Sequence, residues 1–146
     1  MSSLSFAEAC GTIYEELKIR RKHRFIMFKM DEANTLVDVD SVGARDKGWA
    51  DLRSALPERD CRFAIYDHEY DTDRGVKANK LWLLVWIPHN STASKKMQYS
   101  AAKTRFQETC LPGCFECQAS NIDEAEVALG FKKETVDKEE EEDFDF

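Results

Sequence analysis

Apolar residues recur at helical spacing near the start of the chain. An apolar side chain returns every three or four residues from Phe6 to Leu17, which predicts an amphipathic helix over residues 5–18. Similar spacing, or a capping residue followed by apolar positions, predicts three more helices. These lie at residues 49–56, 94–106 and 121–129.

Five other segments have the composition or the alternation of β-strands: residues 24–30, 35–39, 61–66, 80–87 and 114–119. The first two flank a polar turn and predict a β-hairpin. The segment at 80–87, KLWLLVWI, is apolar without alternation, so we expect a central strand with both faces covered. Polar segments at 40–48 and 67–79 predict loops.

The predicted order of elements is therefore α β β α β β α β α. Helices distributed among the strands indicate an α/β (α+β) fold, in which a central mixed five-stranded sheet is flanked by helices on both faces.

The helix predicted at residues 94–106 has two unlike sides. On a helical wheel, Tyr99, Ala102 and Phe106 form a narrow apolar stripe, and Met97 points away from it among lysines. An apolar side chain surrounded by cations suggests a surface that grips a protein partner. The alternative is a solvated helix with one exposed Met, because single exposed apolar residues are common.

Charge divides the chain into a body and a tail. The net charge is −7, but residues 132–146 alone hold three Lys and eight acidic residues, which leaves −2 for the rest. We expect one domain at residues 1–131 and a disordered acidic tail at 132–146. This balance argues against nucleic-acid binding by net charge. We find no run of 18 apolar residues and no signal peptide, so we expect no transmembrane segment.

The cysteines and histidines give weak signals of chemistry. Five Cys, an odd number, are expected to be reduced thiols of a cytosolic protein. Cys114 and Cys117 match C-x-x-C, but on a strand residues three apart face opposite sides. Adding Cys110 leaves a thiol- or zinc-dependent protein as a remote alternative. His68 lies among charged residues without a nucleophile, so we predict no catalytic residues, no metal, no cofactor and no enzyme activity.

Residues 20–24, RRKHR, form a basic cluster after the first helix. Cations at this place complement the helix dipole, which is the interpretation we favour. A nuclear-import signal is the alternative, so nuclear entry stays open beside a cytoplasmic location.

Several segments together resemble the actin-depolymerising factor/cofilin family, in order and from about residue 2 to 123. These segments are LKIRRKHRFIMFKM, LPERDCRFAIYDHEY, KLWLLVWIP, SKKMQYSAAKTRF and CFECQAS. The resemblance implies the mixed sheet between helices described above. It also implies a monomeric, cytoskeleton-associated protein that binds actin monomers and filaments, prefers ADP-actin and promotes severing or depolymerisation.

The resemblance also implies where actin binds. Lys96 and Met97 match the family's Lys-Met pair, and Lys103 matches a further basic contact. On the hairpin, Lys77 and Lys80 match lysines that contact a second actin subunit in the filament. Members of the family also bind phosphoinositide headgroups through basic patches.

The N-terminus has a role in the family as well. Ser2 or Ser3 falls at the family's actin-contacting and often phosphorylated position, and a phosphate there would weaken binding by its negative charge.

The sequence departs from the family in three places. Ser94 stands where the family usually has a basic residue, with Lys95 as the candidate substitute. The hairpin from Tyr70 to Lys80 is slightly short, and the region after Asp123 fits the family poorly. The resemblance implies that these last two regions serve filament contact. A member that mainly sequesters monomers, with weak filament severing, is therefore the second hypothesis.

Overall fold

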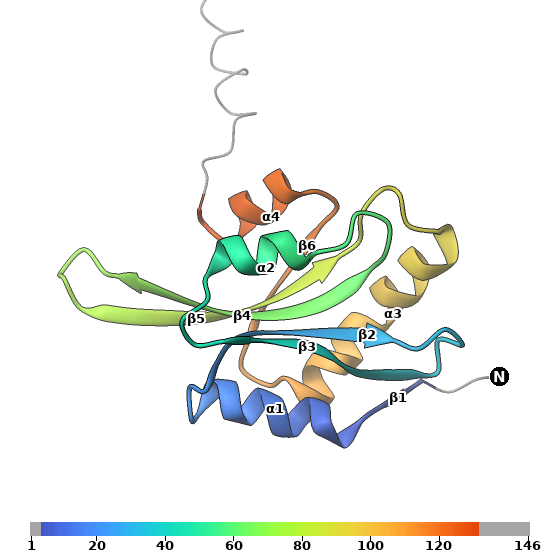
Figure 1. Cartoon of the computed structure of the whole chain (residues 1–146), viewed down its shortest axis with the longest axis horizontal. Coiled ribbons are helices and arrows are strands. Elements are labelled where there is room, and N and C mark those ends of the chain that lie inside the picture. The colour runs from blue at the N-terminus through green and yellow to red at the C-terminus, as the bar shows by residue number, and fades with distance from the viewer. Residues whose placement is uncertain (1–3, 132–146) are drawn as a thin grey trace, which may run out of the picture.

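The computed structural model describes residues 4–131, which form a six-stranded sheet with helices on both faces (Figure 1). The strands are β1 (Ser5–Phe6), β2 (His23–Met30), β3 (Leu36–Ala44), β4 (Arg62–Asp71), β5 (Lys77–Trp86) and β6 (Phe115–Ala119). The helices are α1 (Glu8–Lys18), α2 (Trp49–Ala55), α3 (Ala93–Cys110) and α4 (Ile122–Ala128). Ser2, Ser3 and the tail at 132–146 lie outside the described residues.

The strands lie in the order β1-β3-β2-β4-β5-β6. The two edge pairs, β1 with β3 and β5 with β6, are parallel, and the inner pairs are antiparallel. This confirms the predicted mixed sheet. It also confirms that 80–87 is an inner strand, since β5 has a partner on each side.

The sixth strand was not predicted. Ser5 and Phe6 were assigned to the first helix, but they pair with β3 and α1 begins only at Glu8. The N–H of Ser5 donates to the carbonyl of Thr35 at 2.8 Å, and the N–H of Ala7 donates to that of Val37 at 2.9 Å. The edge of β3 offers these backbone groups a partner that helical periodicity cannot reveal.

Two predicted loops were too long, because three strands continue into polar sequence. β3 runs to Ala44, and β4 and β5 pair as far as Asp71 and Lys77, which shortens the loop at 67–79 to residues 72–76. The hairpin of β4 and β5 projects from the body, so both faces of its outer part meet solvent (Figure 1). Strands exposed in this way lose the hydrophobic alternation by which strands are recognised.

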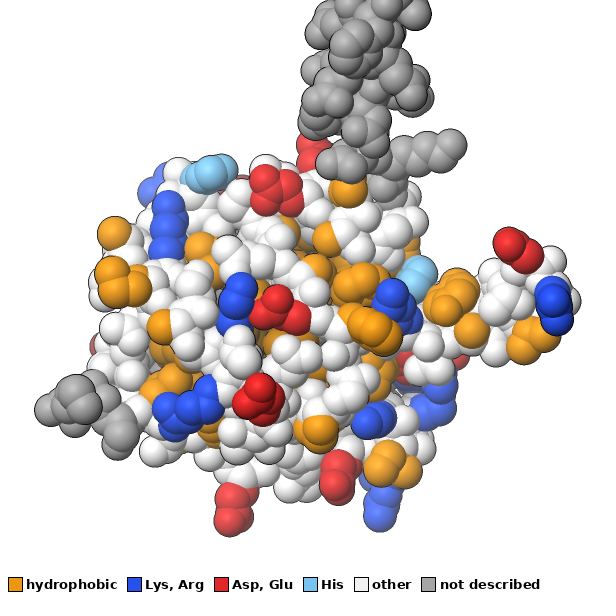
Figure 2. All heavy atoms as spheres, turned by 180° about the vertical axis from the view of Figure 1, so that it is seen from behind, with side chains coloured by type: hydrophobic (Ala, Val, Ile, Leu, Met, Phe, Trp, Pro, Cys, Tyr) orange, Lys and Arg blue, Asp and Glu red, His pale blue; other side chains and the backbone are white. Residues whose placement is uncertain are grey.

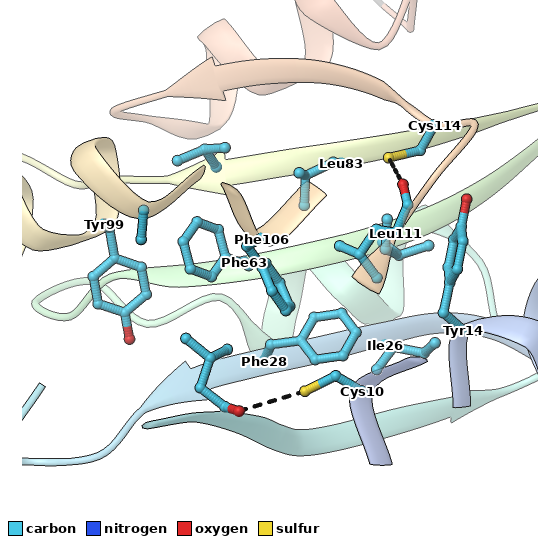
Figure 3. Close-up of a cluster of buried hydrophobic side chains, with 14 of the residues drawn as sticks. Cys10, Tyr14, Ile26, Phe28, Phe63, Leu83, Tyr99, Phe106, Leu111 and Cys114 are labelled. Atoms are coloured by element: carbon cyan, nitrogen blue, oxygen red, sulfur yellow. Dashed lines mark hydrogen bonds between the residues drawn. The ribbon is translucent and has the colours of Figure 1, made fainter. Parts of the chain in front are cut away.

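The two faces of the sheet have separate cores. The α1 and α3 face holds the larger cluster, in which the Phe106 ring lies between those of Phe28 and Phe63, at centroid distances of 5.1 and 5.0 Å (Figure 3). The Phe6 ring lies 5.2 Å from that of Phe106. Beside them, the hydroxyl of Tyr99 accepts a hydrogen bond from the N–H of Met30 at 2.8 Å. The second cluster lies under α2 and α4.

An arginine and carboxylate network holds the base of the hairpin. Asp67 is only 1% exposed and its carboxylate lies 2.8 Å from Arg45 and 3.4 Å from Arg21. Glu69 lies 2.7 Å from Arg21 and 2.6 Å from Arg24. We expected the cluster at 20–24 to complement the α1 dipole, and the structure adds specific partners for Arg21 and Arg24. They pair with the hairpin, where a buried carboxylate needs a cation.

We predict that Phe106→Ala lowers the free energy of unfolding by about 3–5 kcal/mol, because it removes a fully buried ring from the centre of the larger core. Met97→Ala on the same helix is the control, and its effect should stay within about 0.5 kcal/mol, since the side chain is exposed. Urea denaturation followed by circular dichroism measures both. Equal losses in the two variants would contradict this description of α3.

Candidate functional site

The structure fixes α3 as a helix with one face on the sheet and one toward solvent. Its first turn is capped by Thr92, whose hydroxyl accepts the N–H of Lys95 at 3.2 Å, and Leu111 ends it just before Pro112. Tyr99, Ala102 and Phe106 are buried, as the wheel predicted.

The outward side of α3 carries Met97, whose side chain is 68% exposed. Ala101, Thr104 and Glu108 continue this side at intervals of three or four residues and are also exposed. Lys96, partly exposed, adjoins the Met. The result is a shallow surface with one prominent, flexible apolar side chain, of the kind that adapts to a protein partner.

Lys95 does not belong to this outward surface. Its ammonium lies 3.0 Å from a carboxylate oxygen of Asp60, and the other oxygen of Asp60 lies 2.7 Å from Arg62. The side chain of Lys95 therefore ties the first turn of α3 to the sheet, and its role as a substitute contact stays a prediction. The sequence contained the signal, because Lys95 falls on the helical stripe of Tyr99, Ala102 and Phe106.

Lys103 lies on one flank of α3, against the edge strand β6. Its ammonium is 3.1 Å from the side-chain oxygen of Gln118 and 3.6 Å from the carboxylate of Glu116. These contacts hold the cation at the border of the outward surface. They also mean that a partner of Lys103 must compete with two groups of this chain.

The N-terminal segment lies on the other flank of α3. The guanidinium of Arg105 donates to the carbonyl of Leu4 and lies 5.0 Å from the ring centroid of Phe6. The chain therefore enters the described part beside α3, although Ser2 and Ser3 themselves lie outside it. The role of Arg105 was not predicted, because its partner is a backbone carbonyl 101 residues away.

The structure does not bring Lys77 and Lys80 onto one face of the hairpin. Lys77 pairs in register with Asp71 and Lys80 with His68, so the two lysines point to opposite sides of the sheet. Lys77 is 94% exposed, with a distant 4.0 Å pairing to Asp71. Lys80 faces the α4 side, and the role of the two lysines in filament contact stays a prediction.

Lys80 is part of an aromatic groove that we did not predict from the sequence. Its ammonium lies 4.5 Å from the ring centroid of Trp82 and 4.3 Å from that of Phe115, which is 55% exposed. The groove has a volume of about 510 Å³ and is lined by His68, Tyr70, Lys80, Trp82, Ala128, Leu129 and Gly130. Figure 2 shows hydrophobic side chains with a basic one and a histidine where the hairpin leaves the body. The sequence contained a signal for this groove. His68 and Tyr70 on β4, like Lys80 and Trp82 on β5, are two residues apart and therefore share one face of the sheet.

The surroundings of the thiols and of His68 disfavour redox, metal-binding or catalytic roles. Cys114 packs in the larger core and Cys117 against the second, so the C-x-x-C pair is divided by the sheet. Burial raises the pKa of Cys114 to about 11 and that of Cys117 to about 12, which keeps both protonated at neutral pH. Within residues 4–131, no three His, Cys, Asp or Glu side chains are grouped as a metal site would need. His68 stacks on Tyr70 at 5.5 Å, and burial lowers its pKa.

The ion pair of Lys95 gives a prediction about pH. Burial alone would raise the pKa of Asp60, but hydrogen bonds from Arg62 and Lys95 outweigh it and lower the pKa. Lys95→Met should move this pKa up toward the unfolded value of about 3.9 and lower the free energy of unfolding at pH 7 by about 0.5–1 kcal/mol. That stability is present above about pH 4 and is lost as the pH falls through the folded pKa.

Carboxyl NMR titration of Asp60 and urea denaturation at several pH values measure the two effects. Lys96→Met is the matched control and should leave the titration of Asp60 nearly unchanged. An unaltered Asp60 pKa in Lys95→Met would show that the pairing contributes nothing.

None of the helices in the described range 4–131 has the length and apolar character required to cross a membrane.

Comparison with known families gives one extended match. The family model described as "Cofilin/tropomyosin-type actin-binding protein" matches residues 3–133. Actophorin of Acanthamoeba castellanii is 34% identical over 139 residues, which span 95% of this chain and 99% of the relative. Actin-depolymerizing factor 4 of Oryza sativa subsp. japonica is 35% identical over 135 residues, spanning 92% of this chain and 96% of the relative.

Solved structures agree with these sequence matches. The crystal structure of a cofilin from Streptomyces griseoflavus superimposes with a TM-score of 0.78 at 29% identity, covering 93% of this chain and 96% of that one. Actin depolymerization factor 2 of Plasmodium berghei has a TM-score of 0.74 at 22% identity and covers 89% and 95%, a likeness that concerns the fold alone.

Proposed function

Because the chain belongs to the family of cofilin/tropomyosin-type actin-binding proteins, we propose that it binds actin through the outward surface of α3. The observation that supports this most is Met97, an exposed apolar side chain on a helix that is otherwise firmly docked. The relatives actophorin and actin-depolymerizing factor 4 carry names that fit this proposal.

Rigid support of α3 favours binding. Three sets of contacts hold α3 in place. Its buried stripe packs on the sheet, Lys95 in its first turn pairs with Asp60, and Lys103 on its flank contacts β6. A surface ordered before binding loses less conformational entropy when the partner docks. We infer that Met97 supplies the apolar anchor, while Lys96 and Lys103 supply charge complementarity to acidic actin.

A second contact would extend the action from monomers to filaments. Lys80 and its aromatic groove lie on the face of the sheet opposite to α3, so the protein can present two separate surfaces to two actin subunits. If one filament conformation or nucleotide state, such as ADP-actin, fits both surfaces better, binding shifts the filament toward it. Boundaries between bound and bare segments are then the sites at which we expect severing and depolymerisation.

Further features of the proposal concern regulation and location. A phosphate on Ser2 or Ser3 would add negative charge to the chain that reaches α3 at Leu4, and should weaken actin binding. Anionic phosphoinositide headgroups would compete for the same lysines. We expect the protein in the cytoplasm, at actin filaments.

We predict that Met97→Ala combined with Lys96→Ala reduces co-sedimentation with actin filaments and binding to monomers by at least tenfold, because loss of a central anchor costs about 1.4 kcal/mol or more. The matched control is Ile19→Ala with Lys22→Ala, another exposed apolar residue near an exposed lysine but on the chain after α1. Unchanged affinity of the α3 double variant, with the fold intact, would refute the assignment of this surface.

We also predict different effects for the two hairpin lysines. Lys80→Ala should weaken filament binding about fivefold or more, because it removes a cation held over two rings, whereas Lys77→Ala should change it less than about twofold. Monomer binding should stay unchanged in both. A larger loss of filament affinity in Lys77→Ala than in Lys80→Ala would place the filament contact on the opposite face of the hairpin.

One assay distinguishes a protein that severs filaments from one that sequesters monomers. Dilution of fluorescent filaments, watched by microscopy, should reveal new ends if the protein severs. Loss of polymer without new ends would instead favour the sequestering alternative.

A further inference from the structure

We propose that the acidic C-terminal segment, residues 132–146, docks in the aromatic groove beside Lys80 and competes with a filament for this surface. The docking itself stands on features of this chain, while the competition rests on the proposed filament contact. The segment would act as an internal regulator of the second surface and leave the Met97 surface free.

The groove has an affinity for an acidic and aromatic ligand. Its walls are the rings of His68, Tyr70 and Trp82, and the ammonium of Lys80 lies over Trp82 and Phe115. A cation placed at an apolar, partly dehydrated surface attracts a carboxylate more strongly than one in bulk water. The groove therefore fits a peptide in which aromatic and acidic residues alternate.

The indole of Trp82 lies in the wall of the groove. Its nitrogen is buried, and among residues 4–131 it has no hydrogen-bond acceptor. The indoles of Trp49 and Trp86 donate to Glu126 at 2.8 Å and to the carbonyl of Pro57 at 2.7 Å. The Trp82 N–H therefore differs from both, and its resonance is the one that should respond to charges and rings that dock against the indole.

The described chain ends at the groove. Gly130, which lines it, has a φ of 86° and turns the backbone after α4. The Phe131 ring then lies edge-on to His68 at 4.6 Å and stacks on Trp49 at 5.4 Å. The described chain therefore ends next to the groove, and the acidic segment starts from there.

The segment itself has the matching chemistry. It carries a net charge of −5 and ends in the residues 143–146, DFDF. In an extended conformation, Phe144 and Phe146 would lie on one side of the backbone and the Asp residues on the other. This arrangement suits the rings of the groove on one side and Lys80 on the other.

Tethering makes even a weak contact effective. If the 15 residues behave as a random coil, their end-to-end distance is about 20–23 Å, which gives an effective concentration on the order of millimolar. An interaction with a dissociation constant of about 1 mM would then occupy the groove roughly half of the time. The internal competitor should weaken filament binding by about twofold and lose its effect in high salt, where charge attraction is screened.

The first test needs no actin and uses the full chain. The indole N–H resonances of the three tryptophans are compared by NMR in the wild type and in a variant with Glu139→Gln, Glu140→Gln, Glu141→Gln, Glu142→Gln, Phe144→Ser and Phe146→Ser. We expect the Trp82 resonance to shift, and 0.5 M salt to remove the difference. The Trp86 resonance should stay fixed and reports that the fold is intact.

Two results would overturn the proposal. An identical Trp82 resonance in both proteins would mean that the segment does not reach the groove. A shift that depends on protein concentration would mean that the segment of a second copy, not the chain's own, occupies it.

The second test adds filaments at low salt. The tail variant should bind filaments about twofold more tightly than the wild type, and in a Lys80→Ala background the tail substitutions should have no effect. A gain that persists without Lys80 would refute competition at the groove. If the Met97 surface proves not to bind actin, the NMR result still decides whether the segment docks.

Discussion

The packing of Phe106 among Phe6, Phe28 and Phe63 is the interaction on which the other features of the molecule depend. These four rings come from the N-terminal strand, the sheet and the long helix, so one cluster joins segments about a hundred residues apart in the chain. Once Phe106 and Tyr99 face the sheet, helical geometry places Met97 on the solvent side. The exposed Met is therefore a consequence of the core and needs no special local structure.

The rest of α3 is held by polar contacts on the sides of the helix away from Met97. Lys95 binds Asp60 and Arg105 binds the Leu4 carbonyl, and both stabilise the position of the helix. Lys96 and Met97 remain at the outward side. Basic residues that are neighbours in sequence thus have different tasks, because a helix turns about 100° per residue and the two lysines point in different directions.

The sequence predicted the sheet class, nearly all elements and the division of α3 into a buried and an exposed side, because these follow from strong hydrophobic periodicity. It failed where pairing or polar networks decide the structure. β1 exists because the edge of β3 accepts two backbone N–H groups, and the outer hairpin continues because Arg21, Arg24 and Arg45 neutralise Asp67 and Glu69. Strand alternation places Lys77 and Lys80 on opposite sides of the hairpin, as it places Cys114 and Cys117 on opposite sides of the sheet.

The central claim is that Met97 contacts actin directly. The methyl group of this residue can be followed by NMR in protein labelled with carbon-13 at its methionines, while unlabelled actin monomer is added. Met27 and Met30 are buried in the two cores and serve as internal references. If Met97 contacts actin, its methyl resonance shifts or broadens to saturation while those of Met27 and Met30 change little. A Met97 resonance that stays unchanged while actin is bound would contradict it.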